Sequence, residues 1–253
     1  MRNVLVPAQA LYRRHRRQVF TDPTDGLDLP EPGGQRERVA APMEAAKLLA
    51  ALPHADRALW ATAAYAGLRR GELRGLRVSD MHESHVDVSR GWDDYDGAID
   101  PKSRAGKRQV PLPNTLAEIL SEHVERSGRS GDDLLFGRSA SEPFTPSHVR
   151  KGANKAWTDA ELERIALHEL RHSYSTYLDA AGVSETRADR YMGHANSSVA
   201  NRYRHQLEGQ LAEDAARLDA YLDGAGAGKV VALPTGTHTG TQDAQTRMVA
   251  QGA

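Results

Sequence analysis

The stretch IALHELRHSYSTYL, residues 165–178, contains the pattern His168-Glu169-Leu170-Arg171-His172. Its spacing matches H-E-x-x-H, in which two histidines on one helix face bind zinc and the glutamate acts as a general base. The same residues admit a second interpretation, in which His168 and Arg171 bind a phosphate group and the glutamate is incidental. A third is an ordinary helix whose polar side chains only cap and solvate it. The rest of the sequence has to decide among the three.

Composition places the chain among globular proteins. It has 253 residues, of which 39% are hydrophobic and 26% charged, and no apolar run approaches the length of a membrane span. The basic residues of the N-terminus follow its apolar stretch, the reverse of a secretory signal, so we expect a cytoplasmic protein. The absence of cysteine excludes disulfides and thiolate zinc ligands. A net charge of −1 gives no overall attraction to nucleic acid, so any DNA-binding surface must be local.

Turn-forming residues divide the chain. Residues 3–20 are expected to form one helix that ends in the basic run YRRHRR, and the Pro-, Gly- and Asp-rich segment after it predicts a linker over 22–38. A main domain is predicted over 39–223. The last part, 224–253, is rich in Gly, Thr, Gln and Ala and is predicted to be a flexible tail.

Within the main domain the periodicity is mostly helical. Helical spacing covers PMEAAKLLAAL and HADRALWATAAYAGLRRGELRGL near the start, two further segments in the middle, and then 165–222. Between residues 85 and 112 the short runs HVDVSRG, GAIDPK and RQVPLP predict extended structure. The predicted fold class is therefore α+β, mainly α-helical, with a small antiparallel sheet.

Three other stretches bear on the interpretation of His168 and Arg171. In AYAGLRRGELRGL, Arg69 precedes Glu72 by three positions; in DPKSRAGKRQVPLP, Lys102 lies in a hairpin-like segment; in RYMGHANSSVANRYRH, His194 precedes Tyr203 by nine positions. The chain thus carries an ordered set of polar residues: Arg69, Lys102, His168, Arg171, His194 and Tyr203.

This set resembles the tyrosine recombinases, the phage-integrase family of site-specific DNA recombinases. The family pattern is T-G-x-R-x-x-E-L, a hairpin lysine, H-x-L-R-H, and then G-H with a tyrosine nine residues on. The resemblance covers about residues 36–206, and its specificity comes from the conjunction of four pieces in order. Ala66 replaces the usual threonine and Met192 a frequent leucine. Only the terminal helix of the family's N-terminal core-binding domain would fit in residues 1–21.

The resemblance implies the catalytic fold of DNA breaking–rejoining enzymes, the catalytic domain being residues 39–223, and a role for each residue. Tyr203 would attack the scissile phosphate, giving a 3′-phosphotyrosyl link and a free 5′-hydroxyl. Arg69 and Arg171 would hold the phosphate oxygens, because a guanidinium group offers a planar pair of donors and stays charged.

The remaining residues of the set would handle protons and support. His168 would act as general acid or base and His194 would donate to the phosphate. Lys102 would protonate the leaving 5′-oxygen, and Glu72 would support the arginine-bearing helix. No metal or cofactor is implied, because these cations supply the positive charge.

Other interpretations stay open at this point. Taken singly, each residue has an ordinary explanation as a surface arginine, a helix-end histidine or an amphipathic tyrosine; taken jointly, the order and spacing argue against coincidence. A type IB topoisomerase-like enzyme and a catalytically silent DNA-binding remnant of an integrase remain alternatives. A zinc hydrolase is the least favoured, and Glu169 is then expected to be an ordinary surface residue.

The resemblance also implies partners: a double-stranded DNA recombination site and other protomers, assembled as a tetrameric synapse, with no membrane. The YRRHRR cluster would contact the DNA backbone through Arg13, Arg14, Arg16 and Arg17.

A leucine pattern lies after Tyr203. Leu207, Leu211, Leu218 and Leu222 recur at near-helical spacing. They could pack on their own domain; in related recombinases this segment docks on a neighbouring protomer, and we predict such a contact here.

Overall fold

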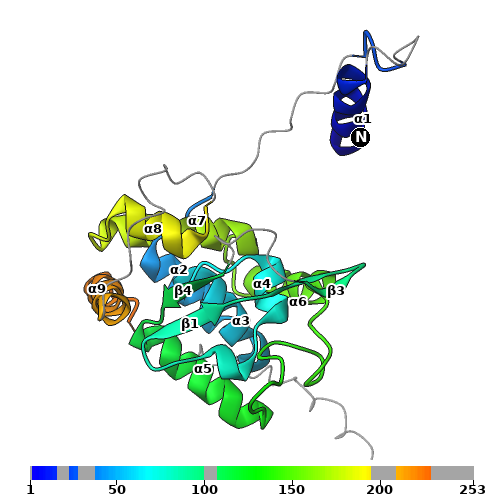
Figure 1. Ribbon diagram of the computed structural model, residues 1–253. Coiled ribbons are helices and arrows are strands. Elements are labelled where there is room, and N and C mark those ends of the chain that lie inside the picture. The colour runs from blue at the N-terminus through cyan, green and yellow to red at the C-terminus, as the bar shows by residue number, and fades with distance from the viewer. Residues whose placement is uncertain (1, 16–22, 28–37, 100–106, 195–208, 229–253) are drawn as a thin grey trace, which may run out of the picture. The chain divides into compact units, whose positions relative to one another are not determined.

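The computed structural model describes residues 2–15, 23–27, 38–99, 107–194 and 209–228 (Figure 1). The chain divides into two compact units, residues 1–37 and 38–253.

The first unit contains helix α1, Arg2–Arg14. The helix was predicted over residues 3–20, and residues 16–20 lie outside the described part. The side-chain amide of Gln9 reaches the backbone carbonyls of Thr24 and Leu27, at 3.4 and 3.5 Å. The first residues of the predicted linker thus form a turn that contacts α1.

The described helices and strands of the second unit agree with the predicted class. The helices are α2 (Pro42–Ala50), α3 (His54–Tyr65), α4 (Arg70–Gly75), the short 3₁₀ helix η1 (Val78–Asp80), α5 (Asn114–Ser127), α6 (Pro146–Asp159), α7 (Leu167–Ala180), α8 (Glu185–Met192) and α9 (Gln210–Gly224). The strands are β1 (His85–Val88), β2 (Gly91–Asp93), β3 (Gly97–Ile99) and β4 (Arg108–Pro111). Strands β1 and β4 pair antiparallel, as do β2 and β3, so the predicted small antiparallel sheet consists of two separate pairs.

Helix α3 lies at the centre of the second unit, where it packs against α5 and α7 (Figure 1). All its residues from Arg57 to Tyr65 are buried, and many are alanines, which let neighbouring helices approach closely. Trp60 of α3 meets Trp157 of α6 edge to face, with ring centroids 4.8 Å apart. This core is the rigid support for the residues of interest on α4, α7 and α8.

The predicted helical run through residues 54–76 is interrupted between Tyr65 and Arg70, immediately before α4. The chain leaves α3 after Tyr65 and passes through Gly67 at φ +62°, a conformation that favours glycine. A Cβ at Gly67 would lie 2.2 Å from Tyr174 Cδ1, so close packing against α7 also requires glycine. The turn places Arg69 in extended conformation immediately before α4.

Helix α9 packs on its own domain. Leu211, Leu218 and Leu222 are all buried in it, so these three follow the alternative of packing on their own domain; Leu207 lies outside the described residues. The contact of this segment with a neighbouring protomer in the DNA-bound assembly stays a prediction. The carboxylate of Asp219 accepts the first backbone N–H groups of α5, which anchors α9 to that helix.

The packed chain also extends past the predicted domain end at 223, because Ala227 is fully buried. Among the described residues, no helix is long and apolar enough to span a membrane.

Candidate functional site

The C-terminal end of helix α8 is built by a glycine turn. Gly193 adopts a left-handed conformation at φ 63°, and its N–H bonds to the Arg190 carbonyl. The next N–H, of His194, bonds to the Asp189 carbonyl at 3.1 Å. These two bonds form the Schellman arrangement that ends many helices. The Gly-His pair of the sequence pattern therefore has a physical basis: the glycine reverses the chain and presents His194.

Three guanidinium groups meet the last carbonyls of this helix. Arg108 Nε donates to the Tyr191 carbonyl at 2.6 Å, Arg171 Nη2 donates to Met192, and Arg69 Nη2 donates to Gly193 at 2.9 Å. A helix C-terminus carries carbonyls without intrahelical partners and a partial negative charge, so it attracts cations. The turn before α4, strand β4 and helix α7 are thereby joined to the end of α8.

Arg171 is the buried member of this group, with 8% of its surface exposed. Its Nη1 donates to the Gly67 carbonyl, so one side chain connects the turn before α4 to the end of α8. Burial, and then the nearby charge of Arg69, lower the pKa of Arg171 to about 10. The guanidinium group therefore stays protonated at neutral pH.

Glu72 links two of the arginines. Its carboxylate accepts two hydrogen bonds from Arg108, both at 2.8 Å, and one each from the backbone N–H and Nη1 of Arg69. Burial acts to raise the pKa of Glu72, but the bonds and charge of Arg108, with help from Arg69, lower it to about 2. Glu72 thus contacts both the backbone and the side chain of Arg69, and its supporting role in the site stays a prediction.

The low pKa of Glu72 predicts a loss of stability in acid. Because the pKa in the folded state lies below the ordinary value of 4.5, the ionised carboxylate stabilises the fold above about pH 4.5. The stabilisation, about 3 kcal/mol, should disappear as the pH falls from 4.5 toward 2. Urea unfolding at several pH values should show this, and Glu72→Gln should flatten that part of the profile. An unchanged acid slope in the variant would contradict the prediction.

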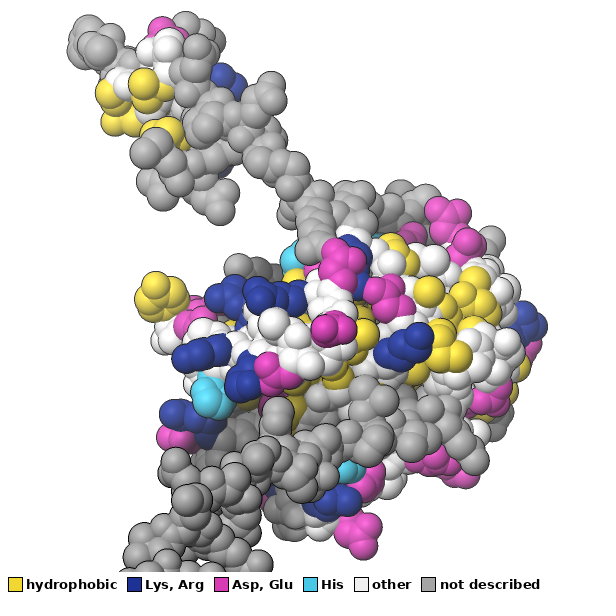
Figure 2. Space-filling view, turned by 180° about the vertical axis from the view of Figure 1, so that it is seen from behind, with side chains coloured by type: hydrophobic (Ala, Val, Ile, Leu, Met, Phe, Trp, Pro, Cys, Tyr) yellow, Lys and Arg dark blue, Asp and Glu magenta, His cyan; other side chains and the backbone are white. Residues whose placement is uncertain are grey.

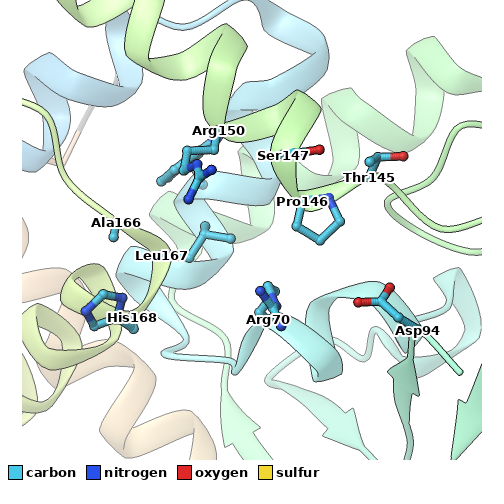
Figure 3. Close-up of a pocket in the computed structure, with 10 residues that line it drawn as sticks. Arg70, Asp94, Thr145, Pro146, Ser147, Arg150, Ala166, Leu167 and His168 are labelled. Carbon is cyan, nitrogen blue, oxygen red and sulfur yellow. The ribbon is translucent and has the colours of Figure 1, made fainter. Parts of the chain in front are cut away.

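His168 borders a cavity of about 640 Å³. Figure 3 shows His168 at one end and Asp94 at the other, with Arg70 between them and Arg150 of α6 above. Arg70 and Arg150 are both exposed, so this cavity presents cationic side chains to solvent. Figure 2 shows, on one face of the second unit, Lys and Arg side chains gathered toward one edge, with acidic ones among them.

His194 is exposed at the end of α8. Its Nδ1 lies 3.0 Å from Asp189 Oδ1, so the carboxylate orients the ring. Because the glycine turn fixes its backbone and Asp189 its ring, His194 is held beside the carbonyls that Arg69 and Arg171 bind.

Glu169, expected at the surface, is buried with 4% of its surface exposed. Its Oε2 accepts the N–H of Ala166 at 2.7 Å, so it caps the first turn of α7. The rings of His168 and His172 lie edge to face with centroids 6.2 Å apart. Among the described residues, neither histidine belongs to a group of three side chains offering metal-ligand atoms close together. A glutamate that caps its own helix does not suit the zinc interpretation.

Several predicted residues have no described position. Lys102 and Tyr203 lie outside the described residues, as do Arg16 and Arg17 of the basic cluster. Arg13 and Arg14 are exposed at the end of α1, in the first unit, and their DNA contacts stay a prediction.

Sequence reasoning missed Arg108. It lies in the same stretch as Lys102, DPKSRAGKRQVPLP, where it resembles one more cation of that segment. Its signal was strand alternation: Arg108 and Val110 share the inward face of β4, and a charged residue at an inward position requires a partner.

The sequence of the chain is similar to those of known proteins. Residues 36–210 match the phage integrase family. A putative prophage phiRv2 integrase of Mycobacterium tuberculosis is 28% identical over 181 residues, covering 66% of this chain and 47% of the relative. A tyrosine recombinase of Pseudothermotoga lettingae is 32% identical over 147 residues, covering 57% of this chain and 47% of the relative. The chain therefore spans about half the length of these curated relatives.

Solved structures show the same fold. The Tn1549 transposon integrase in complex with transposon right end DNA aligns with a TM-score of 0.58 at 20% identity, covering 83% of this chain and 76% of that one. A lambda integrase dimer bound to a COC′ core site aligns with a TM-score of 0.55 at 16% identity, covering 82% and 75%. The predicted fold class is confirmed.

Proposed function

Because the chain belongs to the phage integrase family, we propose that it is a site-specific DNA recombinase that cleaves and rejoins strands through a 3′-phosphotyrosyl intermediate. The observation that carries this proposal is the convergence of Arg69, Arg171 and His194 at the end of α8. Three cationic or donor groups at one point suit a phosphodiester, whose non-bridging oxygens gain charge in the transition state.

The proposed reaction exchanges one ester for another. The phenolic oxygen of Tyr203 forms a bond to phosphorus while the bond from phosphorus to the 5′-oxygen breaks. The phenolic proton goes to a base, for which His168 is the candidate, and Lys102 gives a proton to the leaving 5′-oxygen. Since the number of phosphate ester bonds is unchanged, neither ATP nor water is consumed. Attack by a 5′-hydroxyl of a second strand then releases the enzyme.

The arginines have separate tasks in this scheme. Arg171 stays charged and its position is fixed by burial, so its remaining donors are preorganised for phosphate oxygens. Arg69 is more exposed and is held by Glu72, which leaves it able to exchange its bond to the Gly193 carbonyl for one to phosphate. Because the arginine side chains supply positive charge, the site would stabilise the charge of the transition-state phosphate without an added cofactor.

The DNA backbone that flanks the scissile phosphate is proposed to bind in the cavity beside His168. Arg70 and Arg150 line it and are exposed, so each can pair with a phosphate without loss of a buried contact. A local cationic surface of this kind reconciles DNA binding with a net charge of −1. The proposed partners are a double-stranded recombination site and further protomers in a tetrameric synapse. Because basic residues follow the N-terminal apolar stretch, the reverse of a secretory signal, we propose a cytoplasmic location.

Covalent capture of DNA tests the proposal without knowledge of the site. The protein is incubated with nicked suicide duplexes of randomised sequence, whose cleaved end diffuses away and traps the intermediate. We expect a protease-sensitive, SDS-resistant adduct that selects a limited set of sequences. Tyr203→Phe should form none, whereas Tyr221→Phe, a change on helix α9, should form it normally.

Other outcomes select the alternatives. Bound duplex without any adduct would indicate a catalytically silent remnant. An adduct without sequence selection, accompanied by relaxation of supercoiled DNA, would indicate a topoisomerase-like enzyme.

A further inference from the structure

A compact cluster of ligand-type side chains lies on strand β1 and the turn before it, outside the site described above. His82, His85 and Asp87 each offer one ligand atom, and these atoms all lie within 4.8 Å of one another. His82 Nε2 lies 3.0 Å from one carboxylate oxygen of Asp87, and His85 Nε2 lies 3.7 Å from the other. The two imidazole rings stack, with centroids 4.5 Å apart and planes inclined by 21°.

The side chain of Gln109, on the paired strand β4, completes the cluster. Its amide nitrogen lies 3.0 Å from His85 Nε2 and 3.2 Å from Asp87 Oδ1. An amide N–H₂ group between an imidazole nitrogen and a carboxylate donates to both, so both present lone pairs to the same space. The amide N–H₂ group thus occupies a position where a cation could bind to the same two lone pairs. Rotation of this amide by half a turn would point its carbonyl oxygen there instead.

From this arrangement we propose that His82, His85 and Asp87, with Gln109 as a fourth ligand, form a binding site for a divalent transition-metal ion such as Zn²⁺. Two imidazoles, a carboxylate and an amide oxygen are the donor set of Zn²⁺, Ni²⁺ and Co²⁺, whereas Mg²⁺ and Ca²⁺ prefer oxygen ligands alone. Rotation of the side chains is enough to bring the ligand atoms closer around an ion, and the exposure of His82 leaves room for that rotation.

Strand geometry places this ion next to the network of Arg108 without joining it. His85 and Asp87 alternate with the buried Val86 and Val88, so they share the outward face of β1. Asp87 pairs with Gln109, and the neighbouring pair is Val88 with Arg108. A bound ion would therefore tie β1, β4 and the turn before β1 together, one residue pair from the arginine that holds Glu72. Its expected effect is on the stability of this strand pair, independent of the proposed function.

Calorimetric titration of the tag-free chain with Zn²⁺ tests the site. We expect one equivalent bound, a rise in Tm, and no response to Mg²⁺. His82→Asn and Asp87→Asn should each weaken binding by at least tenfold. His54→Asn is the matched control, because His54 is also exposed beside a carboxylate, that of Glu122 at 3.8 Å, and should bind as the original chain does.

Cobalt gives a readout that does not depend on stability. Co²⁺ should produce visible absorption bands of low-coordinate nitrogen and oxygen ligation in the original chain and in His54→Asn, and these bands should be lost in the double variant of His82 and Asp87. Because both positions are partly exposed, the double variant should keep the Tm of the metal-free chain. Unchanged Zn²⁺ affinity or Co²⁺ spectra in the double variant would overturn the proposal, as would the absence of binding by the original chain.

Discussion

If the proposed function is right, replacing Arg171 by alanine is expected to slow DNA cleavage by at least about a hundredfold and to lower the free energy of unfolding by about 2–6 kcal/mol. The loss of stability follows because the change leaves the carbonyls of Gly67 and Met192 buried without these donors, at a cost of about 1–3 kcal/mol each. The loss of cleavage follows because a fixed donor to the transition-state phosphate is worth about a hundred- to a thousandfold in rate. Urea unfolding and single-turnover cleavage, measured on the same preparations, should show both losses.

Arg171→Lys separates charge from geometry. A lysine keeps the positive charge, but its single nitrogen cannot span Gly67 and Met192 and also present two donors to a phosphate. Stability should be partly retained, while cleavage stays at least about a hundredfold slow. The control is Arg129→Ala, which also removes a guanidinium group bound to backbone carbonyls, those of Leu134, Leu135 and Gly137. It should lose stability but cleave at the original rate once folded. A lysine variant with full activity would contradict the bidentate role.

Sequence could indicate that Arg69, Arg171 and His194 belong together, because the motifs that carry them have fixed spacing. The structure brings these three residues to the end of α8, and their catalytic roles stay a prediction. Gly193 and His194 are an example of such a motif: a glycine turn at a helix end specifies a local geometry, which neighbouring residues determine without help from the rest of the fold. The strands and helices were likewise predictable, since the period of apolar residues depends on local geometry.

What sequence did not predict depends on contacts between distant segments. Glu169 was expected at the surface, but it is buried. The residues next to it in the sequence do not show that other parts of the fold cover that face of α7. The break at Gly67 depends on Tyr174, more than a hundred positions later. Arg108 is the clearest case, because its partners Glu72 and Tyr191 lie on other elements and only the assembled fold brings them to it. The local sequence pattern predicts the period of a helix or strand, but it does not show which distant residue a side chain will contact.

Arg108 leads to the second prediction, that Arg108→Met lowers stability by about 3–5 kcal/mol and slows cleavage. The change removes two bonds to a buried carboxylate and leaves Glu72 with an incompletely compensated charge. Cleavage should slow because Glu72 also holds Arg69, and a shift of about 1 Å in a positioning group costs up to about a hundredfold in rate. Arg57→Met, which removes a buried guanidinium group on α3 that does not contact Glu72, should destabilise the chain without changing the cleavage rate of the folded protein.

A double variant distinguishes positioning from mere support. Adding Glu72→Met to Arg108→Met removes the unpaired charge and fills the space with apolar atoms, so stability should largely return. Cleavage should not return, because the second change removes the carboxylate that fixes Arg69. If the rate recovered together with stability, Arg108 and Glu72 would be structural only, and Arg69 would be positioned by its other contact, the Gly193 carbonyl. If stability recovers and the rate does not, the ion pair acts through the position of Arg69, since only that function requires the carboxylate itself.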